Sequence, residues 1–192
     1  MRKLLLLGML AGVMTNITAA QRHVEGNPAG KVRVVAYEDL ACSDCADFRK
    51  MLDEKLLPKY GGAVGFEHRD FPLAKHVWAR KAAIAARFIE DTAGGEKGMR
   101  FRRDILASIK QVNTTGPDPW IAEWGTKNGV DPAKLVSAQE DKKYAGLVEK
   151  DFQDGVARGV SKTPTVFVEG VPFVETFTFE QVSKAIDEAL AR

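Results

Sequence analysis

The two cysteines of this chain constrain its fold more than any other feature. Cys42 and Cys45 are the only cysteines among 192 residues, and two residues separate them. They follow the apolar, β-branched run 32–37 (VRVVAY), which predicts a strand covered on both faces. From Cys45 onward, apolar residues recur at spacings of three and four, which predicts a helix that starts at the cysteines. We expect Pro58 and the pair Gly61-Gly62 to end this helix.

Beyond that helix the sequence returns to a strand and then changes character. Residues 63–71 (AVGFEHRDF) indicate a second strand, closed by Pro72. Residues 73–159 carry helical spacing and no strand signal, and they predict four or five short helices inserted into the fold. Two of these helices are expected to start at Asp118-Pro119 and Asp131-Pro132, with aspartate as N-cap and proline at the first helical position.

The last part of the chain predicts a hairpin and a final helix. Residues 163–175 (TPTVFVEGVPFVE) indicate two short strands around a turn at Glu169-Gly170, and Thr178 is a candidate N-cap for the closing amphipathic helix. A strand–helix–strand start favours a parallel crossover, whereas the closing strands favour an antiparallel hairpin on the same sheet. The predicted class is therefore α/β, with residues 31–72 and 160–192 forming one domain around the inserted all-helical block.

The N-terminus has the layout of a secretory signal. Residues 1–20 contain Arg2 and Lys3, then an apolar stretch of about ten residues, then small residues, so cleavage is expected after Ala20. A stretch of that length is too short to span a bilayer, although a short retained anchor is the alternative. Residues 21–30 are polar and are expected to form a leader before the fold. We therefore expect a periplasmic or otherwise extracytoplasmic protein with no stable membrane span after cleavage.

Net charge limits the class of partner. The whole chain carries a formal charge of +2, and loss of Arg2 and Lys3 with the signal would leave zero. A nucleic-acid partner is not expected for such a chain.

Three chemistries are open to a closely spaced cysteine pair. A metal site would need two further ligands, and the three histidines, His23, His68 and His76, form no pair at ligand spacing. An inert disulfide would close a very small loop, which restricts the unfolded chain little. A redox-active dithiol fits best, because an oxidising compartment lets the pair alternate between disulfide and thiols. No metal or organic cofactor is implied.

The position of the pair assigns a role to each sulfur. Cys42 at the helix start would be the partly exposed attacking thiol, since unpaired N–H groups and the helix dipole stabilise a thiolate there. Cys45 shares the buried helix face with Phe48 and would resolve the mixed disulfide. Ser43 and Asp44, the two residues between the cysteines, are expected to tune the redox potential of the pair. The Asp44 carboxylate would oppose the thiolate by roughly 1.5–3 kcal/mol at an effective dielectric of ~20–40, which favours a more reducing potential.

These motifs resemble those of the thioredoxin superfamily. A Cys-x-x-Cys that follows a strand and opens a helix is similar to the active site of that superfamily. The segment GVSKTPTVFVEG resembles its cis-proline loop, which implies that Thr163 and Pro164 face the dithiol and bind the substrate backbone.

Finer features resemble the branch of DsbA-like thiol–disulfide oxidoreductases. The stretch VVAYEDLACSDCADF, with Asp39 three residues before Cys42, is similar to that branch, as is the segment RDFPLAKH that ends at His76. The resemblance implies a thioredoxin fold with an inserted all-helical subdomain and exchange of disulfides with polypeptide substrates that carry thiols or disulfides. It also implies a redox partner that recycles the dithiol. Strongly oxidising members carry Pro-His between the cysteines, whereas here Ser43-Asp44 leaves the direction of electron flow open.

Two other functions compete with this hypothesis. A glutathione-dependent transferase or isomerase of the same superfamily would use one catalytic residue and would not need Cys45. A non-catalytic binding module would keep only the fold. His76 is given no chemistry and is expected at a helix start, and Trp120 and Trp124 are expected in the core rather than in the site.

Overall fold

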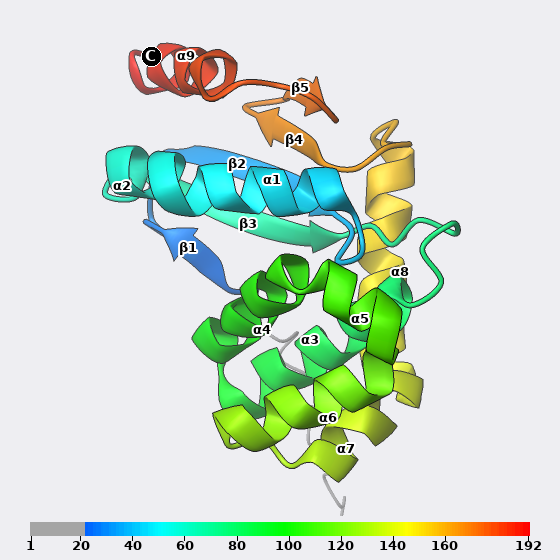
Figure 1. The fold of residues 1–192 in the computed structure, drawn as a ribbon. Coiled ribbons are helices and arrows are strands. Elements are labelled where there is room, and N and C mark those ends of the chain that lie inside the picture. Colours follow the sequence, from blue (N-terminus) through cyan, green and yellow to red (C-terminus); the bar gives the residue numbers. More distant parts are fainter. Residues whose placement is uncertain (1–21) are drawn as a thin grey trace, which may run out of the picture.

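A five-stranded mixed sheet is the centre of the computed structural model, which describes residues 22–192 (Figure 1). The expected signal segment, residues 1–20, lies outside the described residues. The strand order is β1-β3-β2-β4-β5. The bounds are Val24–Gly26 for β1, Val32–Glu38 for β2, Val64–Asp70 for β3, Thr165–Val168 for β4 and Val171–Val174 for β5. Strands β2 and β3 are parallel, and β4 and β5 form an antiparallel hairpin, as the sequence predicted. The structure adds that β4 also pairs antiparallel with β2.

Strand β1 corrects the prediction of a leader over residues 21–30. Val24–Gly26 pairs antiparallel with β3 and forms one edge of the sheet. This strand was not predicted from the sequence, because the strand has only three residues and polar residues flank it. Gly26 is required at its end, since a Cβ there would lie 2.5 Å from the carbonyl oxygen of Val64 and the φ angle is +75°.

The helix after the cysteines runs through Pro58 instead of ending there. It consists of α1 (Ser43–Met51), a π-helical turn (Leu52–Leu56) and α2 (Leu57–Tyr60). A proline inside an α-helix lacks an N–H and its ring collides with the carbonyl group four residues earlier. The wider π turn, in which the Leu57 N–H bonds to the Leu52 carbonyl, accommodates the proline, and the helix ends only before Gly61.

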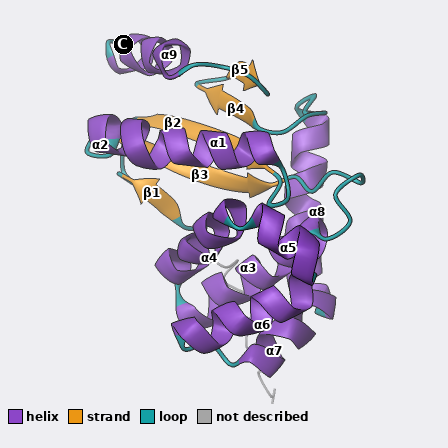
Figure 2. Cartoon of the chain, in the orientation of Figure 1, coloured by secondary structure: helices purple, strands orange, loops and turns teal. Residues whose placement is uncertain are grey.

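Residues 73–159 form a helical block that contains more and longer helices than expected (Figure 2). Asp131 caps its helix as predicted, but the cap at Asp118 was wrong: Gly116 is the N-cap, Pro117 opens the helix and Asp118 lies in the first turn. The block comprises six α-helices: α3 (Ala79–Ala93), α4 (Gly95–Ala107), α5 (Ile109–Thr115), α6 (Pro117–Asn128), α7 (Pro132–Ser137) and α8 (Lys142–Ala157).

Helices cover both faces of the sheet. One face packs against α1, α2 and α9 (Phe179–Leu190), and α9 starts at the predicted cap Thr178 with a complete capping box. The other face packs against α8, where Phe71 stacks on Phe152. Trp120 and Trp124 lie in the core of the helical block, as predicted. Cys42 and Cys45 belong to that same apolar cluster, so the block forms one wall of the site.

Two glycines of α8 offer a matched test of this packing. A Cβ at Gly155 would lie 2.6 Å from the ring of Phe71 and 2.9 Å from that of Tyr37, whereas nothing lies within 4 Å of a Cβ at Gly146. We expect Gly155→Ala to lower the free energy of unfolding by about 1–3 kcal/mol through overpacking. Gly146→Ala should instead raise it by about 0.5–1 kcal/mol through helix propensity. Urea unfolding of both variants checks the pair, and equal effects would contradict this packing.

Candidate active site

The cysteine pair lies where β2 ends and α1 begins. Cys42 is the N-cap of α1, and its N–H donates to the Asp39 carbonyl oxygen at 3.1 Å. Cys45, one turn into the helix, is fully buried, and its sulfur accepts the Asp39 N–H at 3.3 Å. Cys42 is more exposed than Cys45, but at 6% it is more buried than we expected of an attacking thiol. Both are free thiols in this structure.

The Thr163-Pro164 loop, which lies 121 residues further along the chain, contacts the cysteine pair. The peptide bond between them is cis, and the Cys42 Sγ donates to the Thr163 carbonyl oxygen at 3.4 Å. The Thr163 hydroxyl is buried and has no hydrogen-bond partner among the described residues. It is available to donate to the Cys42 sulfur once that thiol has ionised.

Hydrogen bonds lower the pKa of the Cys42 thiol to about 6. The largest contribution is the hydrogen bond from the Cys45 thiol; burial acts in the opposite direction, and the Thr163 side chain together with the backbone N–H groups of Cys45 and Asp44 adds further stabilisation. These N–H groups are the unpaired donors of the first turn of α1. Cys42 is therefore mainly a thiolate at neutral pH.

Asp44 contributes to the site through its backbone. Its side chain is exposed, as is that of Ser43, and the contribution it makes to the Cys42 thiolate is a stabilising backbone N–H. The repulsion that we expected from its carboxylate does not prevent the pKa of Cys42 from falling.

Cys45 has the opposite protonation state. Burial, first, and then the hydrogen bond to Cys42 and the negative charge of Glu38 hold the pKa of the Cys45 thiol well above its usual value. Glu38, at the end of β2, is itself buried, and its Oε1 atom has no hydrogen-bond partner among the described residues. Sequence reasoning missed Glu38, because in sequence it is one acidic residue at the end of a predicted strand.

Asp39 connects the loop after β3 to the cysteine site through hydrogen bonds. Its carboxylate accepts the N–H groups of Ala41 and Leu73, each at 2.7 Å, and the Nδ1 of His76 lies 2.9 Å from it. His76 thus lies in the loop before α3 rather than at a helix start, and its partner is the residue whose N–H contacts the Cys45 sulfur.

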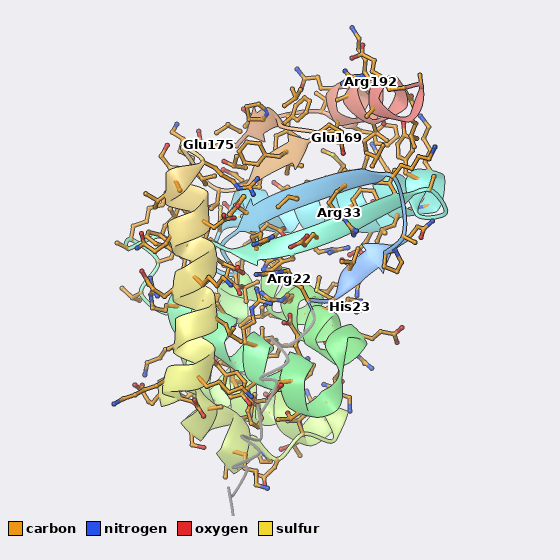
Figure 3. All side chains as sticks on the ribbon, turned by 180° about the vertical axis from the view of Figure 1, so that it is seen from behind. Arg22, His23, Arg33, Glu169, Glu175 and Arg192 are labelled. Atoms are coloured by element: carbon orange, nitrogen blue, oxygen red, sulfur yellow. The ribbon has the colours of Figure 1, made fainter. Side chains whose placement is uncertain are left out.

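A buried ionic network lies behind Glu38 and connects the sheet to the helical block. His68 bridges Glu38, at 2.5 Å, and Asp70, at 3.1 Å. Asp70 accepts from Arg87 and Arg102, each at 2.6 Å. Burial opposes the charge on Asp70, but the two guanidinium groups outweigh it and hold the pKa of Asp70 well below its usual range. Arg22 extends the network by pairing with Asp151 of α8, and Figure 3 labels it beside β3.

The pKa of Cys42 can be measured directly. We expect the rate of Cys42 alkylation by iodoacetamide to rise with pH around a midpoint of about 6, because only the thiolate reacts.

The folded Cys42 thiol has a lower pKa than the unfolded one. The reduced protein should therefore gain stability as pH rises from about 6 toward 8.5 and lose it as pH falls through 6. Thr163→Val should raise the pH midpoint of Cys42 alkylation, because it removes the hydroxyl that donates to the thiolate. A midpoint near 8.5 in the wild-type protein would contradict an activated Cys42.

Within residues 22–192, no group of three or more His, Cys, Asp or Glu side chains could hold a metal ion. In the same range no helix combines the length and the apolar character needed to cross a membrane.

Comparison with known proteins adds a family match and a fold. A sequence family described as Thioredoxin matches residues 18–188. Among solved structures, alpha-DsbA1 of Wolbachia pipientis superposes with a TM-score of 0.78 at 19% identity, over 89% of this chain and 92% of its own. The thiol-disulfide exchange protein alpha-DsbA2 of the same organism gives a TM-score of 0.73 at 21% identity, over 87% of this chain and 86% of its own.

A curated relative carries a different name. The Na(+)/H(+) antiporter NhaA 3 of Salinispora tropica is 28% identical over 190 residues, which is 97% of this chain. The chain spans only 28% of the length of that antiporter, and the same share of a second one, NhaA 1 of Salinispora arenicola.

Proposed function

Since this chain belongs to the thioredoxin family and has the fold of DsbA-like proteins, we propose that it is a thiol–disulfide oxidoreductase that exchanges disulfides with polypeptide substrates. The observation that carries the proposal is the placement of its two thiols: Cys42 is the N-cap of α1 and contacts the Thr163 carbonyl, whereas Cys45 is fully buried one turn further on. Cys42 has a pKa of about 6 and Cys45 a pKa well above the usual value, although two residues separate them. One nucleophile that is ionised and one that stays protonated beside it are what stepwise disulfide exchange requires.

The geometry supports the following reaction with an oxidised substrate. The Cys42 thiolate attacks one sulfur of the substrate disulfide, and the other substrate sulfur leaves as a thiolate that takes up a proton. Cys45 then loses its proton and attacks the Cys42 sulfur, which releases the second substrate thiolate. The protein ends as the Cys42–Cys45 disulfide, having transferred two electrons. With a reduced substrate the same steps run backward.

Glu38 is placed to accept the proton of Cys45 in the second step. It is buried, its Oε1 atom has no hydrogen-bond partner within residues 22–192, and its charge acts on the Cys45 thiol. Thr163 and Pro164 would hold the substrate backbone, because Thr163 contacts Cys42 and Pro164, lacking an N–H, leaves its edge open. A redox partner would restore the starting state of the dithiol.

The N-terminal sequence supports an extracytoplasmic location. Residues 1–20 have the charge, apolar length and small residues of a secretory signal, and an oxidising compartment would allow the cysteine pair to cycle. The Na(+)/H(+) antiporter NhaA 3 is a much longer protein, of which this chain matches only 28%, and the proposed function is therefore argued from the dithiol alone.

The equilibrium potential of the dithiol tests the proposed function. A pKa of about 6 lies between the values of about 7 for thioredoxin and about 3.5 for DsbA. Their potentials, about −270 mV and about −120 mV, therefore bracket an expected potential of about −250 to −220 mV. Equilibration in glutathione or dithiothreitol buffers followed by thiol trapping measures it. A dithiol that never oxidises, or that fails to exchange with any peptide disulfide, would refute the proposal.

A further inference from the structure

A groove beside the dithiol has an apolar floor and an acidic rim. Its volume is about 470 Å³, within the range of roughly 300–1,000 Å³ that is typical of ligand pockets. The floor is made of three side chains from both walls: Phe48, Met51 and Phe177. The polar lining residues are Asp44, Asp47, Glu175, Thr176, Thr178 and Gln181.

Both walls of this groove are connected to the cysteine site. One wall is α1, and Asp44 on it lies between the two cysteines. The other wall is the loop after β5, where Figure 3 labels Glu175. The Glu175 N–H donates to the carbonyl oxygen of Pro164 at 2.8 Å, which fixes this wall to the cis-proline loop. A polypeptide whose cysteine reaches Cys42 would therefore place its neighbouring residues in the groove.

The charges on the rim are unbalanced. None of the lining residues is Lys, Arg or His. Asp44 and Asp47 lie three residues apart on one face of α1, both are exposed, and neither forms an ion pair with any described residue. Glu175 has one partner, Lys162 at 2.6 Å, so the rim keeps two uncompensated carboxylates.

Glu175 also has an uncommon backbone conformation. Its φ angle is +55°, in the left-handed region that glycine or asparagine would occupy more easily. Non-glycine residues in that region cluster at ligand sites, where the position of the side chain outweighs the conformational cost.

We propose that the acidic rim selects polypeptide substrates with a Lys or Arg near the reactive cysteine and an apolar residue beside it. The inference rests on the proposed function, since it names the substrate class of the same dithiol. A basic side chain would pair with Asp44 or Asp47 while the apolar one packs on Phe48 and Met51. Acidic substrates would be repelled by the same carboxylates, and this repulsion adds to the selection that the attraction provides.

Three peptides that differ only in charge test the inference. Each is a seven-residue, end-blocked peptide with a central cysteine and one leucine, present as its mixed disulfide with glutathione. The residues two positions before and after the cysteine are both Lys, both Gln or both Glu. The measured quantity is the second-order rate constant with the reduced, wild-type protein, and we expect the Lys peptide to react on the order of tenfold faster than the Glu peptide at low salt. The ratio should fall toward one as salt screens the exposed charges.

Variants then locate the selection on the rim. Asp47→Asn should reduce the Lys/Glu rate ratio by about two- to fivefold, which is the range expected for one exposed ion pair. Glu54→Gln is the matched control. Glu54 is an exposed acid in the π turn of the same helix, but it does not line the groove. The Lys/Glu rate ratio of this variant should therefore equal that of the wild type.

Each result has one meaning. If no peptide disulfide reacts, the proposed function itself fails. If all three peptides react at one rate, thiol–disulfide exchange stands but the substrate class is wrong. A preference that survives Asp47→Asn, or that Glu54→Gln reduces equally, would assign the selection to the overall field of the protein and overturn the role of this rim.

Discussion

Replacement of Cys45 by Ser is expected to leave the protein attached to its polypeptide substrate through a mixed disulfide at Cys42. Cys42 would still attack, because the backbone donors of α1 and the Thr163 hydroxyl remain, although loss of the Cys45 thiol removes one contribution to its low pKa. No second sulfur would then release the substrate. We expect turnover to fall on the order of 10³-fold or more while the adduct accumulates, as seen by non-reducing electrophoresis and mass spectrometry.

Two further variants separate attack from resolution. Cys42→Ser should lose turnover without forming an adduct, because a serine hydroxyl is not ionised at this position. Glu38→Gln should form the adduct at the normal rate but resolve it about 10²-fold more slowly, which is the usual contribution of a general base. Normal turnover by Cys45→Ser would instead favour an enzyme of the glutathione-transferase type, which needs one catalytic residue. Unchanged partner binding by Cys42→Ala, with no exchange activity in the wild type, would favour a binding module.

The second large effect concerns stability. Arg102, on α4, is 1% exposed and pairs with Asp70 and Glu90. Arg102→Leu would leave the buried Asp70 and the half-buried Glu90 with too few partners. Breaking a buried pair from one side costs about 3–5 kcal/mol of unfolding free energy. For a chain of this length we expect Tm to fall by roughly 10 °C. Arg100→Leu on the same helix removes an exposed arginine and should change the unfolding free energy by less than about 1 kcal/mol.

The same variant should alter acid unfolding. The pKa of Asp70 lies below its unfolded value, so its pairing contributes stability that is present above about pH 4 and is lost as pH falls through the folded pKa. Without Arg102 the folded pKa rises, and the midpoint of acid unfolding should move to higher pH. Circular dichroism at pH 2–7 measures this midpoint. Equal stability losses in Arg102→Leu and Arg100→Leu would refute the role of the network.

Local patterns predicted most of the fold. The β-branched run before Cys42, the helical spacing after Cys45 and the caps Asp131 and Thr178 depend on neighbouring residues only, and the structure confirms them. Where prediction failed, a tertiary contact decided the outcome. Residues 24–26 become a strand only because β3 offers an edge, and Pro58 stays helical only because the preceding turn widens.

The site was predicted less completely than the fold. The cysteines and the Thr163-Pro164 loop have short sequence motifs, and the structure brings them together. Glu38 and the His68–Asp70–Arg102 network have no such motif. Each of these residues is a common polar residue in sequence, and only the burial that folding imposes gives it a perturbed environment. Their importance depends on partners 30 or more residues away, which local spacing cannot reveal.

The contact between Cys42 and Thr163, which spans 121 residues, also has a consequence for the order of events during synthesis. A ribosome adds about 5–20 residues per second, so the cysteine pair emerges roughly 6 to 24 seconds before the loop that completes its surroundings. During that interval Cys42 lacks the Thr163 hydroxyl, one of the hydrogen-bond donors that lower its pKa in the folded protein. The cysteine pair of the nascent chain is thus less activated than that of the folded protein, and Cys42 reaches its full reactivity only after the Thr163-Pro164 loop has docked.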